Sequence, residues 1–116
     1  PEEKEVEFIY APNGIIGLET AWPISVKRIL DGKLMNLNQL LDKLVANPRK
    51  ILNLPVPKIE EGVTANLTIF NTEEEWTYSE GNIHSKSSNS PYLNETLKGR
   101  ALGIYNKGQW QDNTLA

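Results

Sequence analysis

Hydrophobic residues recur at helical spacing in the first half of the chain. The first such stripe consists of Trp22, Val26, Ile29 and Leu30, at spacings of three and four residues. This spacing places the four side chains on one face of an amphipathic helix. We expect Thr20 to cap the helix, Pro23 to occupy its first turn, and Gly32 to form its C-terminal exit.

A second stripe follows Asn36, which is itself a good helix cap. Its members are Leu37, Leu40, Leu41, Leu44 and Val45. They predict a second amphipathic helix that stops at the pair Asn47-Pro48. The same pair is expected to cap and begin a short third helix over residues 49–54.

The pattern changes to β-forming residues after residue 57. We predict strands over residues 63–70, 75–78, 97–105 and 109–111, with a serine- and asparagine-rich loop over 81–91. The run Glu73-Glu74-Glu75 is interpreted as a solvated turn between the first two strands. Asn106-Lys107-Gly108 has the composition of a hairpin turn. Helices followed by strands predict an α+β segment.

Composition narrows the classes of function. A chain of 116 residues is one domain or less, and its formal net charge of -3 without a basic cluster argues against a nucleic-acid partner. No apolar run is long enough to span a bilayer. The absence of cysteine removes thiolate chemistry and is compatible with a cytoplasmic location. The first residue is Pro1, which leads us to expect a piece of a longer protein.

The residues alone do not assemble a catalytic site. The sequence has one histidine, His84, in the polar loop, where a solvated residue is the more frequent case. Hydrolytic metal sites require several convergent histidines and carboxylates, and nucleophile motifs of the Gly-x-Ser-x-Gly type are missing. From the residues alone we expect a soluble domain without a complete active site.

Four ordered segments resemble the dihydroorotases of the cyclic amidohydrolase family. They are EFIYAPNGIIGLETA at residues 7–21, VANPRKILNL at 45–54, EGVTANLTIF at 61–70, and SKSSNSPY at 85–92 followed by LKGR at 97–100. Asn66 and Asn71 stand where the family usually has aspartate, and glycine is missing before Leu54. The family's His-x-His, carboxylated lysine and Asp-His-Ala-Pro-His are not in this chain.

The resemblance implies a fold and a role for the parent protein. Residues 1–54 would form the end of a (β/α)₈ barrel, with its substrate loop and closing helices. Residues 55–116 would be the C-terminal part of a small β-sandwich domain. The parent would be a zinc-dependent hydrolase that interconverts dihydroorotate and N-carbamoyl-aspartate in pyrimidine biosynthesis. Backbone at Asn13 and Gly14 would bind the substrate; an ordinary turn is the alternative. No catalytic residue and no metal ligand are expected within this chain.

The sequence leaves three hypotheses about the function open. The first is a portion of an active dihydroorotase, inert without the missing N-terminal part of the same protein. The second is a non-catalytic, dihydroorotase-like scaffold, and the third is an independent interaction domain. Hydrophobic helix faces that lack their barrel also lead us to expect a homo-oligomer.

Overall fold

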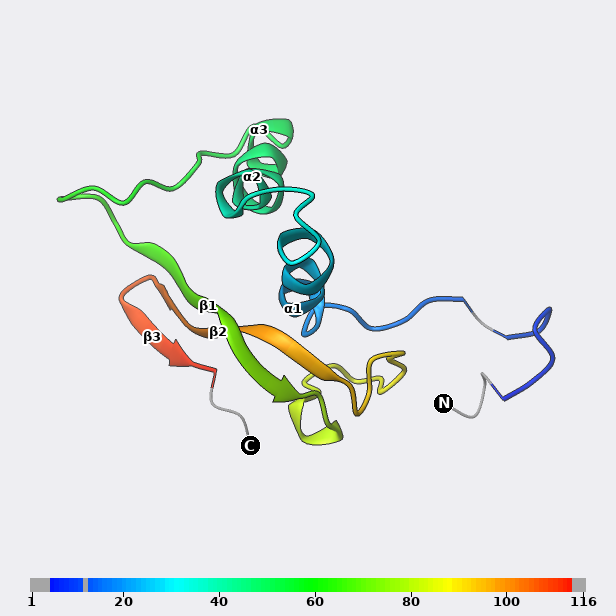
Figure 1. The fold of residues 1–116 in the computed structure, drawn as a ribbon. Helices are drawn as coiled ribbons and strands as arrows, with labels where there is room; N and C mark the ends of the chain where they lie inside the picture. Colours follow the sequence, from blue (N-terminus) through cyan, green and yellow to red (C-terminus); the bar gives the residue numbers. More distant parts are fainter. Residues whose placement is uncertain (1–4, 12, 114–116) are drawn as a thin grey trace.

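Helices precede strands in the computed structural model, which describes residues 5–11 and 13–113 (Figure 1). The predicted α+β class is therefore confirmed. Figure 1 shows the first helix lying between the second helical run and the sheet. A division of the chain at residues 54 and 55 stays a prediction.

The first predicted helix is confirmed. Its α1 segment (Ala21–Ser25) continues directly into a π-helical turn, η2 (Val26–Leu30). The expected termini differ in detail. Thr20 has helical dihedrals and makes no side-chain cap; its hydroxyl donates instead to the Gly17 carbonyl at 3.4 Å. At the other end Lys33, not Gly32, takes the left-handed conformation, with φ of 54°.

The second helical run is longer than predicted. It comprises α2 (Leu37–Leu41), the π-helical turn η3 (Asp42–Ala46) and α3 (Asn47–Ile51). The Asn36 cap is confirmed, because Asn36 and Gln39 exchange two side-chain hydrogen bonds of 3.0 Å.

The predicted stop at Asn47-Pro48 is wrong. The amide of Asn47 donates five residues back to Asp42, so the π-helical turn leads into a proline that has no N–H to place. The third helix also ends earlier than predicted, at Ile51. Asn53 then adopts a φ of 53°, and the Leu54 amide bonds the Arg49 carbonyl at 2.8 Å.

The strands form one antiparallel sheet in the order β1-β2-β3. Their bounds are β1 (Asn66–Thr77), β2 (Thr96–Asn106) and β3 (Gln109–Asp112). The predicted hairpin turn is confirmed, since Lys107 and Gly108 have φ of 50° and 77° between β2 and β3.

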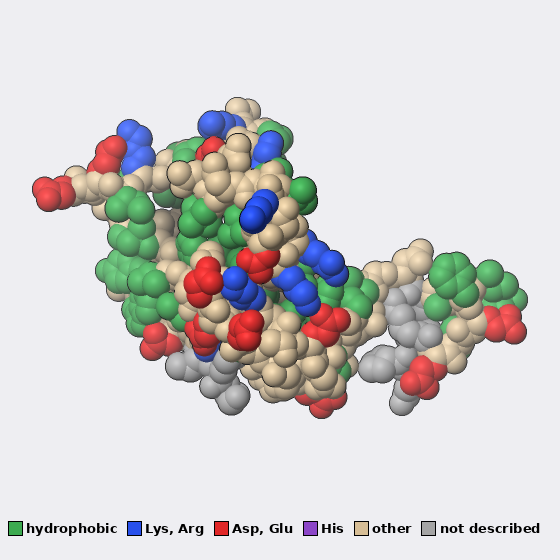
Figure 2. All heavy atoms as spheres, in the orientation of Figure 1, with side chains coloured by type: hydrophobic (Ala, Val, Ile, Leu, Met, Phe, Trp, Pro, Cys, Tyr) green, Lys and Arg blue, Asp and Glu red, His purple; other side chains and the backbone are tan. Residues whose placement is uncertain are grey.

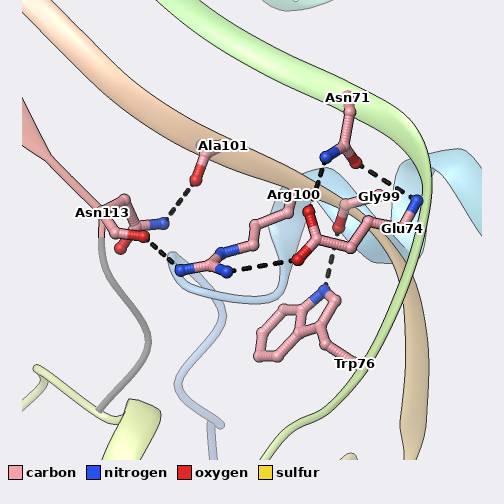
Figure 3. A network of polar contacts seen from close by, with 7 residues as sticks. All are labelled: Asn71, Glu74, Trp76, Gly99, Arg100, Ala101 and Asn113. Carbon is pink, nitrogen blue, oxygen red and sulfur yellow. Dashed lines mark hydrogen bonds and ion pairs between the residues drawn. The ribbon is translucent and has the colours of Figure 1, made fainter.

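The two strands predicted over 63–70 and 75–78 are a single strand, β1. The expected solvated turn at Glu73-Glu74-Glu75 lies inside it, at a bulge where the register shifts between Asn71 and Glu75. Figure 3 shows the contacts at this bulge: Asn71 Nδ2 donates to Glu74 Oε2 at 2.7 Å, and Arg100 Nη1 donates to Glu74 Oε1 at 3.3 Å. Trp76 Nε1 also donates to the Gly99 carbonyl of β2 at 3.0 Å.

The first helix packs on β2 at a glycine. An added Cβ at Gly99 would lie 2.9 Å from Val26 Cγ2, and Gly99 itself has a φ of +85°. Trp22 lies beside this contact; its indole donates to the Asn71 carbonyl at 3.0 Å and meets the Phe70 ring edge-on at 4.5 Å. Val26 and Leu97 are fully buried in this core.

The second helical run has less cover. Leu40 is 1% exposed, but Leu44 of the same stripe is 47% exposed. A groove of about 560 Å³ separates this run from the start of β1, and its lining includes Leu44, Val45, Leu52, Leu54, Ile59 and Phe70. Figure 2 shows hydrophobic side chains at the surface on this side of the molecule.

Candidate functional site

The predicted substrate residues lie in an exposed loop ahead of α1. Asn13 and Gly14 are both exposed, and Gly14 adopts a φ of +100°. A Cβ built on Gly14 would meet nothing within 4 Å, so another molecule could approach the backbone closely there. A role in substrate binding stays a prediction for both residues.

This loop is joined to the polar loop that precedes β2. The Asn89 side-chain amide donates to the Gly14 carbonyl at 2.7 Å, and the backbone carbonyl of Asn89 accepts from the Ile16 amide at 3.0 Å. Asn89 thus bonds the loop at two positions, Gly14 and Ile16, which are two residues apart. We call residues 13–19 the substrate loop and residues 84–92 the clamp loop.

A second set of hydrogen bonds joins the other end of the substrate loop. One carboxylate oxygen of Glu19 accepts from the Ser85 hydroxyl at 2.7 Å, the Ser85 amide at 2.8 Å and the His84 amide at 3.2 Å. Three donors on one oxygen favour its charged form. His84 contributes its backbone amide to this contact.

The environment of Glu19 shifts two pKa values. Burial raises the pKa of Glu19, but the hydrogen bonds from Ser85 and His84 outweigh it, so the net pKa lies below the ordinary value of 4.5. The pKa of Tyr78 is raised, first by burial and then by the negative charge of Glu19, while Ser90 acts in the opposite direction. Glu19 is therefore an anion at neutral pH beside a neutral, fully buried Tyr78.

The clamp loop is closed at its base by the sheet. The Tyr78 amide donates to the Glu95 carbonyl at 3.0 Å, and the Asn94 amide donates to the Tyr78 carbonyl at 2.7 Å. Asn94 reaches this position with a φ of 64°. The segment that contains the clamp loop thus leaves β1 and returns to the adjacent strand β2, and these two bonds join its two ends.

A small pocket lies beside the clamp. It measures about 230 Å³, and its lining includes Glu19, Trp22, Trp76, His84 and Arg100. Arg100 is engaged on two sides, by Glu74 and by the Asn113 carbonyl (Figure 3). Asn113 in turn donates to the Ala101 carbonyl at 2.7 Å, which fixes the chain after β3 against β2.

The part of the chain that the structure describes contains no group of three His, Cys, Asp or Glu residues able to hold a metal ion. The resemblance assigns the zinc to residues outside this chain, and that assignment stays a prediction. Among the same residues, no helix is both long and apolar enough to cross a membrane.

Sequence reasoning missed the residues that make the clamp. Glu19 belongs to the first of the four quoted segments, and Ser85 and Asn89 belong to the last. The four segments that resemble dihydroorotases therefore contained the clamp residues. Nothing in those segments indicated that the first and the last would lie in contact. The structure brings Glu19 to Ser85 and Gly14 to Asn89.

A solved structure shares this fold. D-hydantoinase matches with a TM-score of 0.74 over 94% of this chain and 24% of its own, at 20% sequence identity. No protein-family model matches the chain. The similarity shows that the chain shares the fold of a portion of D-hydantoinase.

The curated relatives that match this chain include dihydroorotases. Dihydroorotase from Geobacter sp. (strain M21) is 43% identical over 109 residues, covering 94% of this chain and 25% of the relative. Dihydroorotase from Clostridioides difficile (strain 630) is 43% identical over 99 residues, covering 85% of this chain and 23% of the relative. The chain is homologous to a C-terminal portion of dihydroorotases, and it spans about a quarter of the length of the curated relatives it matches.

Proposed function

We propose that this chain is the C-terminal portion of an active dihydroorotase, a hydrolase that interconverts dihydroorotate and N-carbamoyl-aspartate in pyrimidine biosynthesis. The observation that carries the proposal is the 43% identity to the Geobacter dihydroorotase over 94% of this chain. An amidohydrolase structure with the same fold supports the broader class of cyclic-amide hydrolase.

Within the parent protein, the substrate loop would contact the substrate through backbone at Asn13 and Gly14. Backbone amides can donate to a carboxylate or a carbonyl oxygen, and glycine admits a close approach. The open space around Gly14 supports this assignment. Residues elsewhere in the parent would hold the zinc, which would polarise the amide carbonyl when bound.

Replacing a segment of a relative tests the proposal directly. This chain would be exchanged for the aligned segment of the Geobacter dihydroorotase, and the chimera assayed with dihydroorotate and by growth of a pyrimidine-requiring strain. We expect turnover and growth without added pyrimidine. A chimera that folds and binds zinc but shows no turnover would contradict the proposal and would favour a non-catalytic scaffold.

A glycine substitution in the chimera tests the substrate loop. Gly14→Val should raise KM or lower kcat, because the side chain occupies the open space and strains a positive φ. The matched control is Gly62→Val, since Gly62 also has a positive φ, of +81°, with nothing within 4 Å of an added Cβ. Equal kinetics for the two variants would reduce Asn13-Gly14 to an ordinary turn.

The chain by itself should be inert. We expect neither hydrolysis of dihydroorotate nor tight zinc binding, because the described residues include no metal-binding group and the whole sequence has one histidine and no cysteine. Steady-state assays of purified chain with added zinc provide the measurement. Turnover above that of a chain-free blank would require a catalytic site within these 116 residues.

A further inference from the structure

Two loops that are far apart in sequence are joined by five hydrogen bonds. Gly14 and Ile16 bond Asn89, and Glu19 accepts from His84 and Ser85 through one of its carboxylate oxygens, Oε1. The separations along the chain are 65 to 75 residues. Such contacts fix the position of one loop relative to another in a way that neither loop encodes locally.

We propose that Asn89 is a positioning residue, which holds the substrate loop in the shape that receives dihydroorotate, with Glu19 as the second anchor. This inference rests on the proposed function and deepens it. Asn89 would act through Gly14, whose carbonyl accepts the hydrogen bond from its side chain. Substrate affinity would thus be set partly by a loop of the β-rich half of the chain.

The geometry around Gly14 explains why a hydrogen-bonded clamp is needed. A glycine with a φ of +100° has no side chain to pack, and the space where one would stand is open. Its backbone can therefore adopt many conformations at little steric cost. The 2.7 Å bond from Asn89 to the Gly14 carbonyl selects one orientation of that peptide group. The bond from Ile16 to the Asn89 carbonyl keeps the loop in register with the clamp.

The second anchor gives the clamp its stiffness. Only Thr20 separates Glu19 from α1. The helical run of α1 and η2 packs on β2 at Gly99. The helix, the sheet and the clamp loop therefore hold the substrate loop from one side. A loop tied at Gly14, Ile16 and Glu19 loses little further entropy when a ligand binds, which favours affinity.

Hydrogen exchange tests the clamp independently of any activity. In the chain itself, the Ile16 amide should exchange about ten-fold faster in Asn89→Ala than in the unchanged chain. The backbone carbonyl of residue 89 remains, but loss of the side-chain bond to Gly14 lets the substrate loop open and expose the Ile16 amide. The Ile104 amide of β2 should keep its protection in both. The matched control, Asn38→Ala, makes the same change at an exposed position of α2 and should leave Ile16 unaffected. An Ile16 amide that exchanges equally fast with and without the Asn89 side chain would overturn the clamp.

Kinetics in the chimera test what the clamp does. For Asn89→Ala we expect KM for dihydroorotate to rise about ten-fold while kcat changes by about two-fold or less, because binding and not the chemical step is affected. Asn38→Ala should match the unchanged chimera. An unchanged KM in a variant that shows the faster Ile16 exchange would overturn the positioning role. Inactivity of the unchanged chimera would instead refute the proposed function, with the exchange result still reporting on the clamp.

Discussion

The two helical runs carry similar hydrophobic stripes, but these stripes are covered to different extents. The first, residues 21–30, rests on β2 with Val26 against Gly99 and Trp22 against Phe70. The second, residues 37–51, buries Leu40 but leaves Leu44 nearly half exposed above an open groove. Amphipathic spacing thus specifies that a helix forms and which face is hydrophobic. It does not specify whether the cover for that face lies within the same segment.

Disturbing the packing of the first helical run on β2 should have the largest effect on stability. In Gly99→Ala the new Cβ would lie 2.9 Å from Val26 and 3.2 Å from the Asn71 carbonyl, at a φ of +85°. Overpacking and left-handed strain together should lower the free energy of unfolding by about 4 kcal/mol. Urea denaturation followed by tryptophan fluorescence measures this change.

The control for that prediction is Gly108→Ala. Gly108 shares the positive φ, at +77°, but an added Cβ there meets nothing within 4 Å. It should cost about 1 kcal/mol, from backbone strain alone. Equal losses in the two variants would show that the helix is not seated on Gly99.

A smaller loss is expected within the second helical run, and it should depend on position. Leu40→Ala should lower the free energy of unfolding by about 3 kcal/mol, because Leu40 is 1% exposed and the substitution leaves a cavity. Leu44→Ala should cost about 1 kcal/mol or less, because Leu44 is 47% exposed. Urea midpoints compare the pair. Similar losses at both positions would mean that the groove over Leu44 is filled.

The open groove should also drive self-association of the isolated chain. Hydrophobic surface left on the second helical run favours pairing with another copy. Sedimentation at high micromolar concentration should show dimers or larger species, and Leu44→Glu should shift them toward monomer without a large loss of stability. A clean monomer for the unchanged chain, with cooperative unfolding, would contradict this expectation.

The smallest effect concerns pH and the clamp. The hydrogen bonds from Ser85 and His84 hold the pKa of Glu19 below 4.5, so the charged form stabilises the folded chain above that pH. This contribution should decrease as the pH falls from about 4.5 through the lowered pKa of the folded state. Glu19→Gln should therefore flatten the fall in stability below pH 4.5.

Urea midpoints at several pH values measure the effect. Glu61→Gln removes a carboxylate from an exposed loop position and serves as the matched control. An identical pH profile for Glu19→Gln and Glu61→Gln would show that Glu19 is not specifically stabilised in its charged form.

Local signals predicted most of the secondary structure. The Asn36 cap and the Lys107-Gly108 turn depend on neighbouring residues and were found as expected. The continuity of β1 was missed because the Asn71–Glu74 bond and Arg100 stabilise a bulge where the sequence alone indicated a turn. The third helix was predicted, but the continuity of the helical run through Asn47 was missed because a π-helical turn changes the hydrogen-bond partners ahead of Pro48.

The sequence indicated two residues of the candidate site, and their role stays a prediction. The resemblance indicated Asn13 and Gly14, and the structure places both in an exposed loop. Asn89 and Glu19 could not be paired from the sequence, since their partners lie 65 to 75 residues away and no local pattern encodes such a distance. Residue type was informative there, but proximity required the fold.

The long separation within the clamp has a consequence for the order of folding. The β2–β3 hairpin closes through two turn residues, and such hairpins form in about 1–10 μs. Joining Gly14 to Asn89 instead closes a loop of 75 residues, which costs more chain entropy and waits for the helix to dock on the sheet. We expect the Ile16 amide to gain protection after the Ile104 amide during refolding, which pulse-labelled exchange can time; simultaneous protection would contradict it. The substrate loop would then be the last part of the segment to take shape, so anything that delays helix docking would delay the site as well.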